Sequence, residues 1–355
     1  MSRRKGPPPK RGEGRSGRSG RGRAQSRESR AESRRREQAE RDGRARDKLR
    51  ATFEDVPPDG RVLCMYGSHA DVDFGHGVGF CLLHPKVHKL FGLCVGDEVW
   101  TEGGDSLDDR VIMARAERRT ELRRTRSEED RAGHVIAANL DRLAITAALH
   151  EPPLRTGALD RYLLLASVLG LEPVLVLTKI DLAPLDDPGW RVLEPYRELG
   201  VPIVATSAAT GAGIEDLRAA LRDHVTAFAG HSGVGKSALC QALGLEGAPQ
   251  TGELSTSGGR VRGKHTTSIA QLLELPGGGW VVDTPGVRAI GLVDLARRDV
   301  GVHFPELAEL AAGCEYADCL HLDEDGCAVQ DAVEDGTIPA SRYEGYRKLV
   351  EAIES

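Results

Sequence analysis

The order of hydrophobic and polar positions divides this 355-residue chain into segments of different texture. Between residues 60 and 116, short apolar runs are separated by glycines, a pattern that predicts a small β-barrel of four or five strands. Beyond residue 139, short apolar runs alternate with segments of helical spacing, which predicts a parallel sheet with helices on both faces. Ligands of such sheets bind beyond the carboxyl ends of the strands, so residues that follow strands are the candidates for chemistry.

The same pattern gives the bounds of the expected elements. Barrel strands are predicted at 61–66, 78–83, 96–101 and 110–116. Strands of the parallel sheet are predicted at 143–149, 174–178, 201–206, 224–229 and 280–282, and helices at 159–169, 192–199, 214–221 and 238–243. A barrel of this size is most often an OB-fold, but its few aromatic residues and several aspartates weaken the case that it contacts RNA. Residues 117–131 are dense in Arg and Glu and form either a solvated linker or part of a basic face.

Composition sets the N-terminal segment apart. Residues 1–50 carry 19 Lys and Arg against 7 Asp and Glu, whereas the whole chain carries 48 against 54, so a basic tail precedes an acidic body. The tail has almost no apolar residues to bury, and we expect residues 1–55 to be disordered in isolation. Two interpretations stay open: an arginine-rich arm that binds RNA by releasing counterions, and a solubilising tail.

The chain shows no sign of a membrane or secretory protein. No apolar run reaches the roughly 18 residues of a membrane span, and the N-terminus lacks the apolar core of a signal peptide. The seven cysteines, three of them near a histidine, suit a reducing compartment with one metal site better than a disulfide framework. We therefore expect a cytoplasmic protein with no membrane partner.

One stretch matches the phosphate-loop pattern G-x-x-x-x-G-K-[ST] at every required position. Its residues are Gly230, His231, Ser232, Gly233, Val234, Gly235, Lys236 and Ser237. A predicted strand precedes it and a predicted helix follows it, as this motif requires. We expect the loop to hold a nucleotide triphosphate, with Lys236 on the outer phosphates and Ser237 on Mg²⁺.

Two strand ends that precede this loop resemble the guanine-binding motifs of GTPases. Thr178, Lys179 and Asp181 resemble the [NT]KxD motif, in which the carboxylate accepts from guanine and the lysine stem covers the base. The motif more often has Asn where this chain has Thr178. Ser207 and Ala208 resemble the loop whose backbone supports the base. Either match alone carries little information.

Two segments after the loop resemble the switch regions of GTPases. Gly263–Lys264–His265–Thr266–Thr267 resembles the segment whose threonine closes on Mg²⁺ and the γ-phosphate. Asp283, at the end of a strand, resembles the residue that holds Mg²⁺ through water, and Gly286 resembles the donor to the γ-phosphate. Five motifs at strand ends or in a switch segment indicate a GTPase.

These motifs run in a permuted order, because the guanine motifs precede the phosphate loop. A circular permutation leaves the site intact, since the same strand ends meet at one edge of the sheet. With residues 95–99, 138–141 and 160–163, this order resembles the RsgA family, also called YjeQ or EngC, over residues 60–350. The resemblance implies a circularly permuted P-loop GTPase domain at 126–298 and an OB-fold-like barrel at 56–125. The arginine-rich tail is not part of that family's pattern.

Residue 287 is Val, where many GTPases have a Gln that orients the attacking water. Intrinsic hydrolysis should therefore be slow. The family resemblance places a histidine beside the switch threonines, which makes His265 the candidate to position water, alongside Lys236 as the phosphate cation. A solvated loop histidine is the other interpretation.

A cluster near the C-terminus presents three thiols and one imidazole in the spacing C-x4-C-x-H-x5-C. Its residues are Cys314, Cys319, His321 and Cys327. Four such ligands fit one closed, tetrahedral and structural Zn²⁺ site, and the spacing also agrees with the RsgA family. We therefore expect a zinc-binding domain at 299–355.

The resemblance implies a GTPase that binds GTP and GDP with Mg²⁺, contacts the small ribosomal subunit and its rRNA, and couples hydrolysis to late assembly of that subunit. We expect a monomer whose turnover is slow alone and stimulated by the subunit. Two other classes stay open: an RNA-binding scaffold whose nucleotide is only structural, and a P-loop ATPase that acts on a small molecule. Turnover and nucleotide competition distinguish them.

Overall fold

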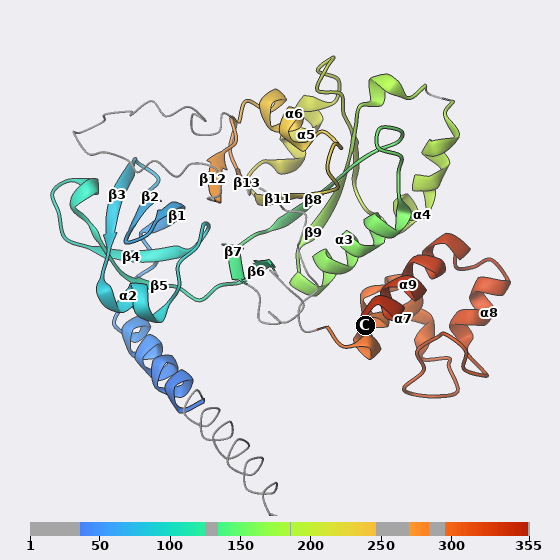
Figure 1. Ribbon diagram of the computed structural model, residues 1–355, viewed down its shortest axis with the longest axis horizontal. Helices are drawn as coiled ribbons and strands as arrows, with labels where there is room; N and C mark the ends of the chain where they lie inside the picture. The colour runs from blue at the N-terminus through green and yellow to red at the C-terminus, as the bar shows by residue number, and fades with distance from the viewer. Residues whose placement is uncertain (1–35, 125–133, 185, 246–269, 284–294, 354–355) are drawn as a thin grey trace, which may run out of the picture. The chain divides into compact units, whose positions relative to one another are not determined.

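The computed structural model describes residues 36–124, 134–184, 186–245, 270–283 and 295–353 (Figure 1). The chain forms two compact units, residues 1–54 and residues 55–355, and each is described by itself. Four candidate residues and the valine of the second switch segment lie outside the described residues: His265, Thr266, Thr267, Gly286 and Val287.

In the first unit, residues 36–51 are helical. This stretch is rich in Arg, Ala and Glu, which are strong helix formers. Glu40 pairs with Arg36 at 3.6 Å and with Arg44 at 3.9 Å, one turn to either side. The expectation of disorder came from mean composition, whereas helix propensity and charge pairs act locally at residues 36–51; residues 1–35 lie outside the described residues.

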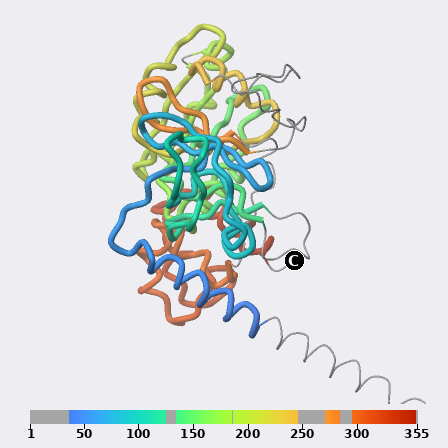
Figure 2. Tube along the Cα trace, turned by 90° about the vertical axis from the view of Figure 1, so that its left-hand side faces the viewer, coloured from blue at the N-terminus to red at the C-terminus, as the bar shows by residue number. Residues whose placement is uncertain are grey.

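The second unit begins with a five-stranded barrel (Figures 1 and 2). Its strands are β1 Gly60–Tyr66, β2 His69–Asp73, β3 Val78–Leu83, β4 Glu98–Glu102 and β5 Val111–Arg115. They pair in the order β1-β2-β3-β5-β4, and β1 also pairs with β4, which closes the barrel. Alternate side chains fill its interior, among them those of Val62, Val72, Cys81 and Ile112. The OB-fold-like barrel is confirmed, with β2 as an additional strand.

A two-stranded sheet follows where a linker or a basic face was expected. In it, β6 Glu121–Arg124 pairs with β7 His134–Ala138. Just before β6, Arg118 Nε donates to Oδ1 of the fully buried Asp97 at 2.7 Å. Arg118 Nη1 also donates to Glu121 Oε1 at 3.0 Å. At Arg118 both interpretations are wrong, because this guanidinium neutralises a buried carboxylate.

The central sheet has the order β10-β9-β8-β11-β13-β12. Its strands are β8 Arg142–Ala148, β9 Glu172–Thr178, β10 Ile203–Ala205, β11 Val225–Ala229, β12 Gln271–Glu274 and β13 Trp280–Asp283. All neighbours are parallel except β12, which is antiparallel to β13. Strand β12, which the sequence pattern did not predict, also pairs with β1 of the barrel through Gln271 and Cys64. Barrel and sheet are therefore continuous.

Helices cover both faces of this sheet. They are α3 Thr156–Leu169, α4 Glu194–Glu198, α5 Ile214–Leu221 and α6 Lys236–Ala242. Side chains of α3 and α4 belong to the core on one face, and those of α5 and α6 belong to the core on the other. Within β8, Leu143 and Ile145 point into the first core and Ala144 into the second, as a period of two requires. The predicted parallel sheet with helices on both faces is confirmed.

The last described segment is helical. It contains α7 Pro305–Ala311, α8 Ala328–Glu334 and α9 Ala340–Ile353. These helices share an apolar core that also takes Leu164 from α3. Across the described ranges, no helix combines the length and the hydrophobicity that crossing a membrane requires.

Candidate nucleotide site and metal centre

The phosphate-loop motif forms the turn between β11 and α6. Gly230, Gly233 and Gly235 have φ values of 149°, 82° and 100°, which side chains with a Cβ rarely adopt. A Cβ on Gly230 would also lie 2.3 Å from the carbonyl oxygen of Thr146. The backbone itself therefore requires these glycines, and the loop has the strand-to-helix context that the sequence predicted.

Lys236 begins α6, and its amino group reaches back over the loop. Its Nζ donates to the carbonyl oxygens of Gly230 at 2.6 Å and His231 at 2.8 Å. This ammonium and the N–H groups at the start of α6 concentrate positive charge at one end of the loop. An arrangement of this kind is suited to the phosphates of a nucleotide.

The strand end after β9 contacts this loop directly. The buried Thr178 donates its hydroxyl proton to the carbonyl oxygen of Val234. Lys179 Nζ donates to the carbonyl oxygen of Gly233 at 2.9 Å, across 54 positions of sequence. Thr178 thus makes a supporting contact, although the family more often has Asn at this position. The first guanine motif and the phosphate loop form one site.

Asp181 and Ser207 meet at two neighbouring strand ends. Because β9 and β10 are parallel, their carboxyl ends lie side by side. The Ser207 hydroxyl donates to Asp181 Oδ1, and Ala208 follows in the same turn. The exposed Asp181 carboxylate is thereby oriented, and a carboxylate can accept from the N1–H and 2-amino groups of guanine, which adenine lacks.

Asp283 ends β13, the strand beside β11. Burial raises the pKa of the Asp283 carboxyl above its ordinary value. Burial and the nearby Asp283 charge also raise the pKa of the Cys240 thiol, on α6, to about 11. Asp283 therefore lies near the helix that carries Ser237. A hydroxyl and a carboxylate are ligands that Mg²⁺ accepts, and a divalent cation would reverse the raised pKa, so this donor set fits Mg²⁺.

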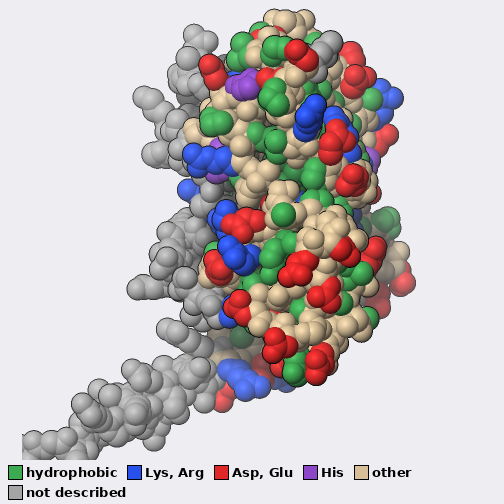
Figure 3. Space-filling view, turned by 90° about the vertical axis from the view of Figure 1, so that its right-hand side faces the viewer, with side chains coloured by type: hydrophobic (Ala, Val, Ile, Leu, Met, Phe, Trp, Pro, Cys, Tyr) green, Lys and Arg blue, Asp and Glu red, His purple; other side chains and the backbone are tan. Residues whose placement is uncertain are grey.

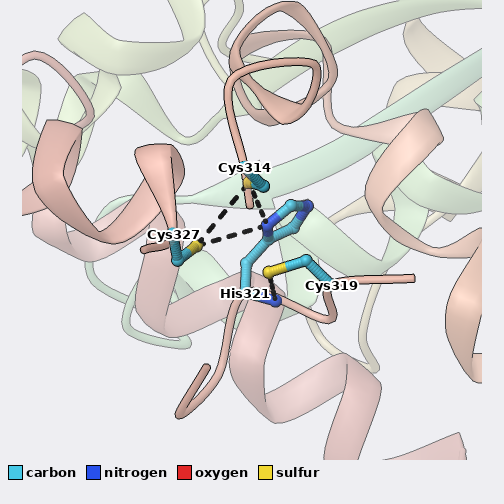
Figure 4. A group of neighbouring side chains, drawn as sticks. All are labelled: Cys314, Cys319, His321 and Cys327. Carbon is cyan, nitrogen blue, oxygen red and sulfur yellow. Dashed lines mark hydrogen bonds between the residues drawn. The ribbon is translucent and has the colours of Figure 1, made fainter. Parts of the chain in front are cut away.

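Four predicted ligands converge in the loop before α8 (Figure 4). The ligand atoms of Cys314, Cys319, His321 and Cys327 all lie within 4.8 Å of one another. His321 Nδ1 is 3.5 Å from Cys314 Sγ and 3.4 Å from Cys327 Sγ, and these sulfurs are 3.9 Å apart. Corners of a tetrahedron around Zn²⁺ are about 3.5–3.8 Å apart at usual bond lengths. The cluster could therefore hold one metal ion.

Groups around the cluster hold the loop that carries His321. This residue has a left-handed φ of 57°, and its carbonyl oxygen accepts from the Tyr343 hydroxyl at 2.7 Å. The Tyr346 hydroxyl donates to the carbonyl oxygen of Leu320 at 2.8 Å, and the Leu320 N–H donates to Glu324 Oε1 at 2.9 Å. The loop is thus fixed by two tyrosines of α9 and one carboxylate.

Burial sets the protonation of the ligands while no metal is bound. It raises the pKa of Cys319 to about 12, raises the pKa of Cys327 and lowers the pKa of His321. At neutral pH these thiols keep their protons, whereas the imidazole is neutral and ready to bind. Metal binding must therefore release thiol protons, which makes the affinity depend on pH.

The structure pairs Asp160 and Arg342, two residues for which the sequence predicts no role. Arg342 Nη1 donates to Asp160 Oδ1, and both side chains are buried. Arg342 Nε also donates to Glu306 Oε1 at 2.7 Å. The available signal was a charged residue at a position of α3 where helical spacing calls for an apolar one.

Comparisons with known proteins agree on one family. The family model described as RsgA GTPase matches residues 115–293. The chain is 42% identical over 258 residues to the small ribosomal subunit biogenesis GTPase RsgA of Chlorobaculum parvum, which covers 72% of this chain and 81% of that relative. It is 38% identical over 319 residues to the protein of that name from Pseudomonas aeruginosa, covering 88% of this chain and 90% of the relative.

Two solved structures are similar over most of their length. YjeQ from Thermotoga maritima superposes with a TM-score of 0.68 at 32% identity, covering 83% of this chain and 98% of that chain. YloQ, described as a circularly permuted GTPase, gives a TM-score of 0.66 at 27% identity, covering 84% of this chain and 96% of that chain. The permuted arrangement of the motifs therefore has a structural precedent.

Proposed function

This chain belongs to the RsgA GTPase family, and from that premise we propose that it binds the small ribosomal subunit and couples GTP hydrolysis to late assembly or maturation of that subunit. The observation that carries the proposal is the contact of Thr178 and Lys179 with the phosphate loop, at Val234 and Gly233. Guanine recognition and phosphate binding belong to one site in this arrangement. The printed name of the curated relatives, small ribosomal subunit biogenesis GTPase, supports the partner.

We assign the nucleotide contacts by position in this site. Asp181 accepts from the guanine edge, the Lys179 stem covers the base, and Ser207 and Ala208 support it from behind. The phosphate loop, residues 230–237, cradles the phosphates, and Gly286 donates to the γ-phosphate. Ser237, one of Thr266 and Thr267, and, through water, Asp283 would hold Mg²⁺, which would supply positive charge to neutralise the phosphates.

Catalysis in this proposal is mainly positioning and charge stabilisation. Lys236 faces the phosphoryl oxygens where negative charge develops, and His265 orients the attacking water, because Val287 cannot. Turnover without a partner is then slow. Contact with the small subunit would stimulate it.

The metal of the C-terminal cluster is proposed to be one structural Zn²⁺. Three thiolates and one imidazole are a donor set that zinc favours, and four protein ligands leave no open position for catalysis. With the domain at 299–355, this completes the proposed organisation into a tail at 1–55, a barrel at 56–125 and a GTPase domain at 126–298. The proposal places a monomer in the cytoplasm, where ribosomal subunits are assembled.

Because their charges differ, the basic tail and the C-terminal helices are proposed to contribute differently to rRNA binding. Asp and Glu side chains recur on the face shown in Figure 3. Exposed acidic residues between residues 301 and 353 are Glu309, Glu315, Asp318, Asp323, Asp325, Asp331, Glu334, Asp335 and Glu351. Exposed cations between residues 301 and 353 are Arg347 and Lys348. General attraction to phosphate therefore cannot come from these helices, and we assign it to the basic tail.

Deleting residues 1–50 tests that assignment. Each neutralised phosphate contributes about 0.7–0.9 to the slope of log affinity against log salt, so the deletion should make the slope for subunit binding shallower. Contacts that depend on shape should survive. A slope equal to that of the full chain would leave the tail with only a solubilising role.

The central test is GTP turnover with and without purified small ribosomal subunits. We expect slow turnover alone, stimulation by subunits, and competition by GDP but poor competition by ATP. Lys236→Ala should abolish hydrolysis, and His265→Ala should lower kcat while leaving GTP affinity nearly intact. Binding without multiple turnover would favour an RNA-binding scaffold, and equal competition by ATP would favour a P-loop ATPase.

A further inference from the structure

The loop after β8 lies in the middle of the proposed nucleotide site. Strand β8 stands between β9, which ends in the first guanine motif, and β11, which ends in the phosphate loop (Figure 1). Both neighbours are parallel to β8, so the segments that follow the three strands meet at one edge of the sheet. Residues 149–155, the β8 loop, connect β8 to α3. The sequence predicts no role for them, although the sheet places them between the two motifs.

The ammonium group of Lys179 joins the β8 loop to the phosphate loop. Its Nζ donates to the carbonyl oxygen of Glu151 and, at 2.9 Å, to the carbonyl oxygen of Gly233. A lysine has a flexible stem and rotating donors, so the acceptors on both sides fix where its ammonium group lies. The course of the Lys179 stem, which is proposed to cover the base, therefore depends on the position of the Glu151 carbonyl oxygen.

His150, the residue before Glu151, anchors the β8 loop to another segment. Its Nε2 donates to Asp187 Oδ2 at 2.5 Å. Asp187 Oδ1 also accepts from the Gly189 N–H at 2.7 Å, and the Asp187 side chain is 9% exposed. The Gly189 N–H and the His150 imidazole lower the pKa of the Asp187 carboxyl from its ordinary value. Asp187 is therefore ionised at neutral pH and can only accept, which assigns the proton of this hydrogen bond to His150 Nε2.

The fold supports both sides of this anchor. Asp187 directly precedes the 3-10 helix Pro188–Leu193, whose Leu193 is fully buried in the core that β8 and α3 also fill. In the β8 loop, the Leu154 N–H donates to the carbonyl oxygen of Leu149 at 3.1 Å, which closes the loop on itself. The hydrogen bond from His150 therefore ties a closed loop to a supported partner, beside the carbonyl group that accepts from Lys179.

We propose that His150 is a positioning residue for guanine nucleotides: its bond to Asp187 places the Glu151 carbonyl oxygen, and that oxygen holds the Lys179 ammonium group. The inference deepens the proposed function and rests on it, because Lys179 covers guanine in that site. His150 acts through the main chain and Lys179 without touching the nucleotide. GDP and GTP share the base, so both should lose affinity equally when the bond is removed, while turnover at saturating GTP should stay native.

The expected effects follow from what each substitution keeps. His150→Leu keeps side-chain bulk and removes the donor, so GDP affinity should fall by about twofold to fivefold, the range for an ion pair with one exposed partner. His150→Gln places an amide N–H where the imidazole Nε2 lies, and it should bind GDP as the native chain does. A role that depended only on the shape of the imidazole ring would leave both variants equally impaired.

A double-mutant cycle on the full chain tests the route. Lys179→Met keeps an unbranched stem over the base and removes the ammonium group, so adding His150→Leu to it should cause no further loss. The dissociation constant and release rate of fluorescent GDP are measured for the native chain, the three single variants and the double variant. His224→Leu is the matched control, because His224 Nε2 lies 3.8 Å from Glu172 Oε2 at the opposite edge of the sheet.

Two further measurements keep the result interpretable. Thermal melting without nucleotide checks folding. Asp187→Asn, which keeps an acceptor for the Gly189 N–H but removes the charge that His150 meets, replaces His150→Leu if that variant is unstable. Turnover at saturating GTP separates an effect on the base from one on the phosphates, and a lower value in His150→Leu would overturn the proposed route.

The proposal expects His224→Leu to bind GDP as the native chain does. Unchanged GDP affinity in His150→Leu overturns the role of His150, and so does a loss that His150→Gln fails to restore. Equal losses from His150→Leu with and without the Lys179 ammonium group overturn the route through Lys179. A native chain that binds no GDP would refute the proposed function instead, so the two failures are distinguishable.

Discussion

The phosphate loop and the metal centre differ in what holds their residues in place. The loop joins β11 to α6, whose side chains Ala227, Phe228 and Leu239 lie in the apolar cores of the sheet. In the segment 312–327, by contrast, the buried positions are His321 and Cys327, which are both predicted ligands. Apolar core residues therefore hold the phosphate loop in place, and the residues proposed to bind nucleotide are not part of that core. At the metal centre, by contrast, the predicted metal ligands are themselves the buried residues of the segment.

The largest expected effect is loss of a metal ligand. Cys319→Ser should unfold the segment around the cluster, because binding energy of roughly 10 kcal/mol or more in small zinc sites is also folding energy. Nucleotide affinity should stay close to native, because the sheet supports the loop independently. Metal content, limited proteolysis and GDP binding measure the two regions separately.

The matched control is Cys81→Ser, a buried cysteine of the barrel outside the cluster. It should keep a full complement of metal. If Cys319→Ser abolished GDP binding as completely as it released the metal, the two regions would fold as one unit and the comparison above would fail.

Local patterns were enough to predict the strands and helices around the proposed nucleotide site. The predicted helix at 214–221 agrees with α5, and the predicted strand at 224–229 agrees with β11 to within one residue, because their apolar spacing is regular and tertiary contacts do not override it. The phosphate loop, the first guanine motif and Asp283 could be found because their chemistry requires particular residues directly after strands. The contact between Lys179 and Gly233 could not, since it depends on which strands are neighbours.

The features that the sequence does not predict involve partners distant in the chain. Strand β12 is only four residues long, and its neighbouring Leu272 and Leu273 pack into the cores on opposite faces of the sheet. Its sequence therefore shows no alternation of apolar and polar residues, and its pairing with β1 had no local signal. Arg118 resembled a surface residue because its carboxylate partner, Asp97, is 21 positions away. Propensity and composition describe neighbours in sequence and cannot reveal a buried charge pair made by folding.

The second-largest expected effect comes from Asp181, in the proposed nucleotide site. Asp181→Asn replaces a charged acceptor by an amide, and two hydrogen bonds to a charged group contribute about 1.5–3 kcal/mol each. GTP affinity should fall by about 100-fold or more, while xanthine nucleotides, which have an oxygen at position 2, should bind better. The melting temperature should change little, because Asp181 is exposed.

Competition binding with GTP and xanthosine triphosphate measures this change, and Asp186→Asn is a control in the exposed turn that follows. A large drop in melting temperature of Asp181→Asn would contradict the separation of site from fold. Equal loss of affinity for both nucleotides would mean that Asp181 does not read the base.

The smallest effect concerns the two tyrosines that support the metal loop. Tyr346 is 1% exposed, so Tyr346→Phe would leave the Leu320 carbonyl without its donor in a place where water cannot replace it. Such a loss costs about 1–3 kcal/mol, or roughly 5-fold to 150-fold in metal affinity. Tyr343 is partly exposed, and water can replace its hydroxyl at the carbonyl oxygen of His321, so Tyr343→Phe should cost less.

Chelator competition measures the metal affinity of both variants, with Tyr316→Phe as the control, because that side chain is 49% exposed. A larger effect from Tyr343→Phe would show that the contact adjacent to the ligand outweighs burial, and the metal centre would then depend less on the packing of α9 than its geometry implies.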